Sequence, residues 1–289
     1  MSLHVDVFNL SRRLFLLQLL LLTACGVKST LNQGDEFSVG VISYNEGEQT
    51  LNRFAGFNRY LSEKTGLLIK LEPTFNENIA LERIREGAWS LVFAPPGVAA
   101  IAIARHQYLP LFPLQGIGNL RSILVVRKNS PLRDLKELKG QTVVLGQLGS
   151  ATGYYLPIYN LYGLTMAEIL FAPTPKTVLE WVAQGKATAG ALSREEFNLY
   201  SSQFRHTEFR TLFSDPHNVP SGVVLIGPTV ERNRQEYIRK VMSEAPAVLT
   251  QEVGYVPNGS VPDYQYMISV VERVKPIATH VREQPAQLF

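Results

Sequence analysis

The chain of 289 residues has a formal net charge of +3, and 45% of its residues are hydrophobic. This composition is typical of a globular protein, and the scattered basic residues argue against a nucleic-acid partner. Cys25 is the single cysteine, which excludes disulfide bonds within the chain and leaves the remaining residues without a thiol for catalysis or metal binding.

The first predicted element is an export signal. Two arginines precede a short apolar run over residues 14–22, which small residues and Cys25 follow. This order is typical of a secretory signal peptide, and the run is shorter than the about 20 apolar residues that span a bilayer. Leu22-Thr23-Ala24-Cys25 resembles the bacterial lipobox, whose cysteine becomes the acylated first residue of a lipoprotein. We therefore expect a signal peptide over 1–24 and lipidation at Cys25; the alternative is that this cysteine is an ordinary small residue of the signal peptide.

A polar segment without periodicity follows over residues 25–36. It predicts a lipidated, flexible tether between the membrane and a folded domain that starts near residue 37. The sequence thus predicts an exported bacterial lipoprotein, anchored to the cell membrane at Cys25 and facing the periplasm or the cell exterior.

Strand and helix patterns alternate from residue 37 onward. Short apolar or alternating runs predict strands over 37–42, 67–71, 89–94, 109–114, 123–127, 142–145, 169–171, 188–192 and 223–226. Helical spacing and stop signals predict helices over 50–65, 76–87, 98–105, 132–138, 154–162, 176–185, 229–252 and 263–274. We expect Pro157 to kink its helix or to mark where regular geometry begins. This alternation predicts the α/β class, with mostly parallel sheets flanked by helices.

Apparent strand crossings near 123–128 and 222–227 predict two lobes around a ligand cleft, with the crossings as hinges. The first lobe would be discontinuous, formed by residues 37–125 plus 226–289, and the second would hold residues 126–225. Ligand sites in open α/β sheets lie beyond the carboxyl ends of the strands.

The segment with the most suitable chemistry at such a position is Gly149-Ser150-Ala151-Thr152-Gly153. Its glycines allow close backbone approach, its amides at a helix start are unpaired donors, and Ser150 and Thr152 supply neutral hydroxyls. This arrangement suits phosphate, phosphonate, sulfonate or carboxylate. The alternative is an ordinary strand-to-helix turn in which Ser150 caps the helix.

Three segments resemble the phosphate, phosphite and phosphonate-binding proteins of ABC importers. Ser150 to Pro157 is similar to that family's Ser-Thr-Ser-Gly-x-x-x-Pro signature, and residues 135–143 and 182–190 resemble its Leu-x-x-Leu-Lys-Gly-x-x-Val and Val-x-x-Gly-x-Val-Asp-Ala-Gly stretches. The likeness covers most of residues 37–230. It implies a two-lobed periplasmic-binding-protein fold of the second type, which closes on a ligand between its lobes.

Other positions depart from the family pattern. Thr188 replaces an aspartate that faces the non-phosphate part of the ligand, so an amine-bearing phosphonate would lose its partner, and Pro175 replaces a histidine. The ligand within the oxyanion class therefore stays open. By resemblance and position, the predicted ligand-binding residues are Ser150, Ala151, Thr152, Gly153, Tyr44, Pro96 and Thr188. A rim tyrosine and a strand-terminating turn are the alternatives for Tyr44 and Pro96.

The resemblance implies a membrane-anchored substrate-binding lipoprotein that captures a small oxyanion and delivers it to an ABC permease, and we expect a monomer. The histidines are too dispersed for metal ligation, so neither a metal nor a cofactor is expected. The sequence lacks a Gly-x-Ser-x-Gly elbow, a His-Glu-x-x-His motif and a P-loop, so it does not predict an enzyme. The alternative function is a non-transport sensor or accessory solute-binding lipoprotein of the same fold with a different ligand.

Overall fold

A computed structural model describes residues 36–42, 47–74, 76–116 and 120–289. The predicted signal peptide, the lipidation site Cys25 and the predicted ligand contact Tyr44 lie outside the described residues. Over the part of the chain that is described, no helix combines the length and apolarity needed to cross a membrane.

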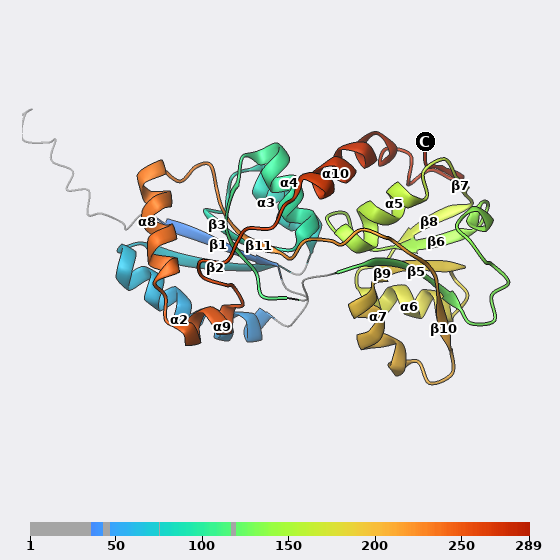
Figure 1. Ribbon diagram of the computed structural model, residues 1–289, viewed down its shortest axis with the longest axis horizontal. Helices are drawn as coiled ribbons and strands as arrows, with labels where there is room; N and C mark the ends of the chain where they lie inside the picture. Colours follow the sequence, from blue (N-terminus) through green and yellow to red (C-terminus); the bar gives the residue numbers. More distant parts are fainter. Residues whose placement is uncertain (1–35, 43–46, 75, 117–119) are drawn as a thin grey trace, which may run out of the picture. The chain divides into compact units, whose positions relative to one another are not determined.

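The first sheet has five strands in the order β2-β1-β3-β11-β4 (Figure 1). Its strands are β1 (Glu36–Ile42), β2 (Leu68–Thr74), β3 (Leu91–Ala94), β4 (Leu109–Pro113) and β11 (Val223–Ile226). β1 pairs in parallel with β2 and β3, whereas β11 lies antiparallel between β3 and β4. All residues of β3 and β11 are buried, as expected for short apolar strands at the centre of a covered sheet.

The second sheet has five strands in the order β10-β5-β9-β6-β8. They are β5 (Ser122–Arg127), β6 (Thr142–Leu145), β8 (Glu168–Phe171), β9 (Ala189–Ser193) and β10 (Phe209–Ser214). β6 pairs in parallel with β8 and β9, and β5 is antiparallel to β9 and β10. Each sheet thus contains one strand that runs opposite to the others, β11 in the first and β5 in the second. Each of these is the first strand that the chain forms after it crosses from the other sheet. The predicted α/β class with mostly parallel sheets is confirmed.

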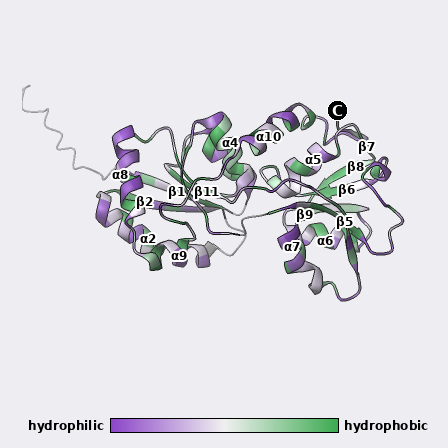
Figure 2. Cartoon of the chain, viewed as in Figure 1, coloured by the Kyte–Doolittle hydropathy of each residue, from purple (hydrophilic) through white to green (hydrophobic). Residues whose placement is uncertain are grey.

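Helices flank both sheets. The longer ones are α2 (Gly47–Thr65), α3 (Glu77–Arg85), α4 (Pro96–His106), α6 (Pro175–Ala183), α8 (Arg232–Ser243) and α10 (Gln265–Ile277). The shorter ones are α5 (Leu156–Asn160), α7 (Arg194–Tyr200), α9 (Ala247–Val253) and the single turns η1 (Lys136–Leu138), η2 (Ala151–Tyr155) and η3 (Ser201–Gln203). Figure 2 shows the contrast between the hydrophilic α7 and α8 and the hydrophobic strand β6.

Two proline positions explain where helices start and stop. The helix predicted over 229–252 is two helices, α8 and α9, because Pro246 cannot donate a backbone hydrogen bond within a continuous helix. Pro157 stands in the first turn of α5, directly after the π-helical turn η2. Its missing N–H removes no helical bond there, so Pro157 marks where regular α-helical geometry begins, as predicted.

Burial is concentrated in three apolar clusters. One covers a face of the first sheet and includes Phe54 and Phe93, whose ring centroids lie 4.9 Å apart in an edge-to-face arrangement. Another lies between the second sheet and α6. The third contains residues of both sheets together with α4, α5 and α10, among them Val92 and Leu145. The two sheets therefore share one continuous layer of apolar packing.

The chain passes between the sheets after β4 and again after β10. The two connections are joined, since the N–H of Val219 donates to the carbonyl of Leu120 at 2.8 Å. The predicted lobe boundaries, after residues 125 and 225, fall inside β5 and β11, each of which belongs to one sheet over its whole length. The division into lobes, with hinges near 123–128 and 222–227, stays a prediction.

The C-terminal segment, which the prediction assigned to the first lobe, contacts elements that flank both sheets. On α10, the carboxylate of Glu272 accepts a hydrogen bond from Arg105 of α4 at 2.8 Å. The neighbouring Arg273 donates to the hydroxyl of Tyr159 on α5 at 3.2 Å. The final strand β12 (Ala286–Gln287) pairs with β7 (Thr165–Met166). Residues 265–289 therefore connect the two halves of the molecule.

We expect Gly40→Ala to destabilise the first sheet. A Cβ at Gly40 would lie 2.2 Å from Cδ2 of Trp89, whose side chain is buried against β1. Overpacking of this kind lowers the free energy of unfolding by about 1–3 kcal/mol. Thermal unfolding followed by circular dichroism should show a lower midpoint for Gly40→Ala. Gly116→Ala should be close to wild type, because an added Cβ there meets no atom of the described residues within 4 Å apart from its chain neighbours. Equal midpoints for the two variants would contradict the packing argument.

Candidate functional site

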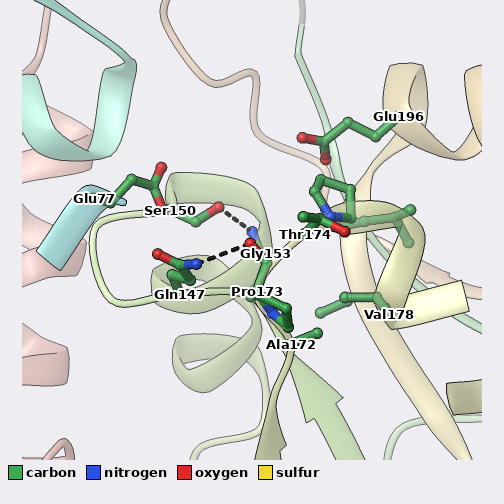
Figure 3. Close-up of a pocket in the computed structure, with 13 residues that line it drawn as sticks. Glu77, Gln147, Ser150, Gly153, Ala172, Pro173, Thr174, Val178 and Glu196 are labelled. Atoms are coloured by element: carbon green, nitrogen blue, oxygen red, sulfur yellow. Dashed lines mark hydrogen bonds between the residues drawn. The ribbon is translucent and has the colours of Figure 1, made fainter. Parts of the chain in front are cut away.

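A pocket lies at the carboxyl ends of β6, β8 and β9 (Figure 3). Its lining residues come from the loops after β6 and β8, from β9, and from the first turns of η2, α3, α6 and α7: Glu77, Gly146, Gln147, Ser150, Gly153, Ala172, Pro173, Thr174, Pro175, Val178, Ala191, Leu192 and Glu196. The position agrees with the rule that ligands of open α/β sheets bind beyond the carboxyl ends of the strands.

The loop after β6 is held in one geometry by hydrogen bonds within the loop and from a neighbouring strand. Ser150 Oγ accepts from the N–H of Gly153 at 3.0 Å, so the predicted alternative of a helix cap at Ser150 is present. Gly149 has a φ of +109°, a backbone conformation that L side chains rarely adopt. From β5, Ser122 Oγ donates to the carbonyl of Thr152 at 2.6 Å. The loop is therefore preorganised by its own sequence and by the strand beside it.

Capping does not use all of the donors in this loop. Within the described residues, the backbone N–H groups of Ala151 and Thr152 donate no hydrogen bond, and the Thr152 hydroxyl also has no partner. Ser150 accepts with its oxygen, so its own hydroxyl hydrogen stays available. The loop thus offers up to four neutral donors, two amides and two hydroxyls, close together at the start of a helical turn.

Two acidic side chains line the same pocket. Glu77 stands at the start of α3, is 3% exposed, and packs so close to the loop that a Cβ on Gly149 would lie 2.8 Å from its Cβ. Glu196 forms a capping box with Ser193: its carboxylate accepts from the Ser193 N–H at 2.8 Å, and Ser193 Oγ accepts from the Glu196 N–H at 3.1 Å. Burial raises the pKa of Glu196, although its hydrogen bonds from Ser193 act in the opposite direction.

Gln147 contributes an acceptor on the wall between these groups. Its side-chain nitrogen donates to the carbonyl of Pro173 at 2.8 Å, but its Oε1 is buried and has no hydrogen-bond partner among the described residues. Buried polar atoms are normally hydrogen-bonded, so an unpaired acceptor here is a position where a ligand donor would be stabilising. Sequence reasoning missed Glu77, Gln147 and Glu196. The Ser-x-x-Glu pattern at 193–196 signals a helix start, but it carries no information about the pocket.

The first turn of α4 closes the other side of the loop. A Cβ on Gly97 would lie 2.0 Å from the carbonyl oxygen of Gly149 and 2.7 Å from the nitrogen of Ala151. Only a glycine at position 97 allows this backbone approach. Pro96 precedes this glycine in the first turn of α4 but does not itself line the pocket.

Of the predicted ligand-binding residues, Ser150 and Gly153 line the pocket, whereas Ala151 and Thr152 are their buried neighbours in the loop and do not line it. The position of Thr188 requires a correction. β9 runs parallel to β6, with Ala189 opposite Val143, so Thr188 lies at the amino ends of both strands. Its hydroxyl donates to Gln141 Oε1 at 3.0 Å. The loop follows the opposite end of β6, and Thr188 is therefore removed from the candidate site. Among the residues described, no group of three His, Cys, Asp or Glu side chains could hold a metal ion.

Comparison with known proteins identifies the family and the fold of the chain. Residues 39–248 match the family model described as "ABC transporter, phosphonate, periplasmic substrate-binding protein". The fold is similar to a binding-protein component of a phosphonate ABC transporter from Pseudomonas aeruginosa (TM-score 0.63, 14% identity, 86% of this chain and 88% of that chain). It is also similar to PhnD1 from Prochlorococcus marinus in complex with methylphosphonate (TM-score 0.62, 19% identity, 83% and 98%). A third similar structure is chloride-bound XAC2383 from Xanthomonas citri (TM-score 0.67, 19% identity, 83% and 99%). The expected periplasmic-binding-protein fold of the second type is confirmed.

We expect Glu196→Gln to reduce the pH dependence of stability. Burial raises the pKa of Glu196 above its ordinary value of 4.5, so the folded protein binds this proton more tightly than the unfolded chain does. Ionisation of Glu196 should therefore cost stability as the pH rises above about 4.5. Glutamine keeps the acceptor for Ser193 but cannot ionise. The difference in melting midpoint between Glu196→Gln and wild type should shift in favour of the variant from pH 4.5 to pH 8.

The control is Glu63→Gln on the exposed surface of α2, which should follow the wild-type pH profile. Parallel profiles for wild type and Glu196→Gln would show that burial does not disfavour the charged form of this carboxyl group.

Proposed function

The chain belongs to the family of periplasmic substrate-binding proteins of phosphonate ABC transporters, and from this membership we propose that it captures a small oxyanion of the phosphate, phosphite or phosphonate class. This is a family of transport proteins rather than of enzymes, and its members act outside the cytoplasm. The proposed binding site is the pocket beside the loop 149–153, with Ser150, Ala151, Thr152 and Gly153 as ligand contacts.

The observation that carries this proposal is the set of unused donors in the loop. The amides of Ala151 and Thr152 and the hydroxyls of Ser150 and Thr152 can each donate to an anionic oxygen, and none of them adds a full charge. Hydrogen bonds to an ionised acceptor are about twice as strong as those between neutral groups. Donors that the fold has already fixed in place also lose little entropy when a ligand binds.

The hydrogen-bond acceptors that line the pocket indicate which oxyanions would bind best. A solute consisting only of a doubly charged oxyanion would meet the carboxyl groups of Glu77 and Glu196 as well as the donors of the loop. Like charges at close range are unfavourable unless one group is protonated. A solute with an anionic head and a second group that donates hydrogen bonds, such as an amine, satisfies both sides, because the head meets the loop and the donor meets Gln147 Oε1 and the carboxyl groups. We therefore propose an amine-bearing oxyanion as the preferred ligand, contrary to the expectation from Thr188.

Delivery to a permease and anchoring at Cys25 complete the proposal. The pocket is lined by residues after strands of the second sheet and by Glu77 of α3, which packs beside the first sheet. A ligand that contacts both parts shifts the population toward a closed arrangement, which a permease can recognise. The signal peptide, the lipid anchor, the tether and the monomeric state are supported by the sequence alone. No observation favours the alternative of a sensor.

A thermal-shift panel tests the proposed ligand class. We expect methylphosphonate, phosphite, phosphate or an aminoalkyl phosphonate to stabilise the folded protein. A ligand at about 100 times its Kd contributes about 2.7 kcal/mol to the free energy of unfolding. The aminoalkyl phosphonate should bind more tightly than the alkyl phosphonate of equal length. An unchanged melting midpoint with every oxyanion would contradict the proposed function.

The double variant Ser150→Ala and Thr152→Ala tests the loop, and we expect its Kd to rise at least tenfold by calorimetry. Loss of a hydrogen bond to a charged group costs about 1.5–3 kcal/mol, so two lost donors suffice. Thr188→Ala is the matched control, since Thr188 lies at the other end of β6 and β9, and its Kd should be unchanged. An unchanged Kd in the double variant would remove the loop from the site.

The anchor is tested by Cys25→Ser, expressed with the complete leader. We expect the wild type in the membrane fraction and the variant released from it, because serine cannot carry the thioether-linked lipid. Wild type and variant found together in the membrane fraction would contradict lipidation at Cys25.

A further inference from the structure

A second cavity lies between α3, α4 and the end of α10, helices that stand side by side in Figure 1. Five basic side chains line it: Arg85, Arg105, His106, Lys275 and Arg282. Glu82 is the one acidic side chain among its lining residues. We call this cavity the basic groove.

The positive charge of the basic groove is poorly compensated. Arg105 is paired with Glu272 at 2.8 Å. Within the described residues, Arg85, Lys275 and Arg282 have no carboxylate within 4.0 Å. The guanidinium of Arg282 lies 5.6 Å from the centre of the Phe171 ring, which orients it without neutralising it. The groove therefore attracts anions.

The pKa of His106, which lines the same groove, is lowered by burial and by the positive charges around it. Burial lowers the pKa of His106, and the charges of Arg105 and Arg85 lower it further. The other charged groups around it are Lys275, Arg282 and the paired Glu272 on or after α10, and Glu82 on α3. Apolar residues of α3, α4 and α10 form the remaining wall, among them Leu81, Ile101 and Val271. A concave, partly apolar wall with several cations on different helices is suited to a compact molecule rather than to a flat surface.

The basic groove is distinct from the candidate functional site. The two cavities share no lining residue, although a third cavity adjoins both of them. Their charged groups are opposite, with two carboxyl groups in the first and three arginines and a lysine in the second. A ligand with several negative groups would be repelled by Glu77 and Glu196 but attracted to the basic groove.

We propose that the basic groove is a second binding site, which takes a small soluble polyanion with at least two phosphate-type or carboxylate-type groups. The cations belong to three elements, with Arg85 on α3, Arg105 on α4 and Lys275 on α10. Negative groups spread along one molecule can interact with cations on all three elements. Because these cations lie on three different helices, such a ligand would stabilise the packing of α10 against α3 and α4. This proposal does not depend on the proposed function.

Tripolyphosphate is the probe, and its Kd is measured by calorimetry at low and moderate salt. We expect the double variant Arg85→Glu and Lys275→Glu to weaken binding at least tenfold, and wild-type affinity to fall as salt increases. Two exposed basic residues of α8 provide the matched control, Arg239→Glu with Lys240→Glu, which makes the same change in net charge and should leave the Kd unchanged. Ser150→Ala with Thr152→Ala should also leave it unchanged.

Failure of this proposal is distinguishable from failure of the proposed function. Affinity for a phosphonate should be retained in the groove variant, and affinity for tripolyphosphate should be retained in the loop variant. Absence of tripolyphosphate binding, loss of it in the loop variant only, or equal loss in the α8 control would each overturn the second site. Vesicles of phosphatidylcholine with and without phosphatidylglycerol form a further arm, and binding to the anionic vesicles alone would assign the groove to a lipid surface instead. Arg85→Gln with Lys275→Gln repeats the test if the charge-reversed variant does not fold.

Discussion

The backbone contact between Gly97 and Gly149 is the constraint on which the rest of the site depends. It places the first turn of α4 directly against the loop after β6, at a separation that leaves no room for a Cβ at position 97. Gly149 in turn leaves space for Glu77, which supplies one wall of the pocket. The hydrogen-bond donors of the loop therefore lie close to Glu77, because Gly97 and Gly149 have no side chains to hold the chain segments apart.

Much of the fold could be predicted from local patterns. Short apolar strands between helical segments predicted the alternating architecture, and strong breakers such as Gly87 and Gly185 agree with where helices end. The turn after β6 was also predictable, because glycine, serine and threonine directly after a strand favour a helix start with Ser150 as its cap, which the structure has. Pro157 was informative for the same local reason. Pro246, in contrast, was overlooked, and the predicted helix there was too long.

The pocket's composition could not be predicted in the same way, because it depends on register and on packing between distant segments. Thr188 was selected by its place in a motif, but the parallel pairing of β6 and β9 sends it to the wrong end of the sheet. Glu196 follows the correct end of β9 and is brought to the pocket by a capping box that looks purely local in sequence. Glu77 arrives from an element that packs beside the first sheet. Neither periodicity nor composition records these spatial relations.

The position of β11 within the first sheet affects the order in which the two sheets can form. All five strands of the second sheet lie within residues 122–214, so its ladder can close as soon as that stretch emerges. The first sheet has to wait, because β11 inserts between β3 and β4, which are much earlier in the chain. Until then β3 and β4 present unpaired edges, which are prone to associate with other chains. The second sheet can thus be completed before the first, although most strands of the first sheet are synthesised earlier, and the first sheet keeps its unpaired edges until β11 arrives.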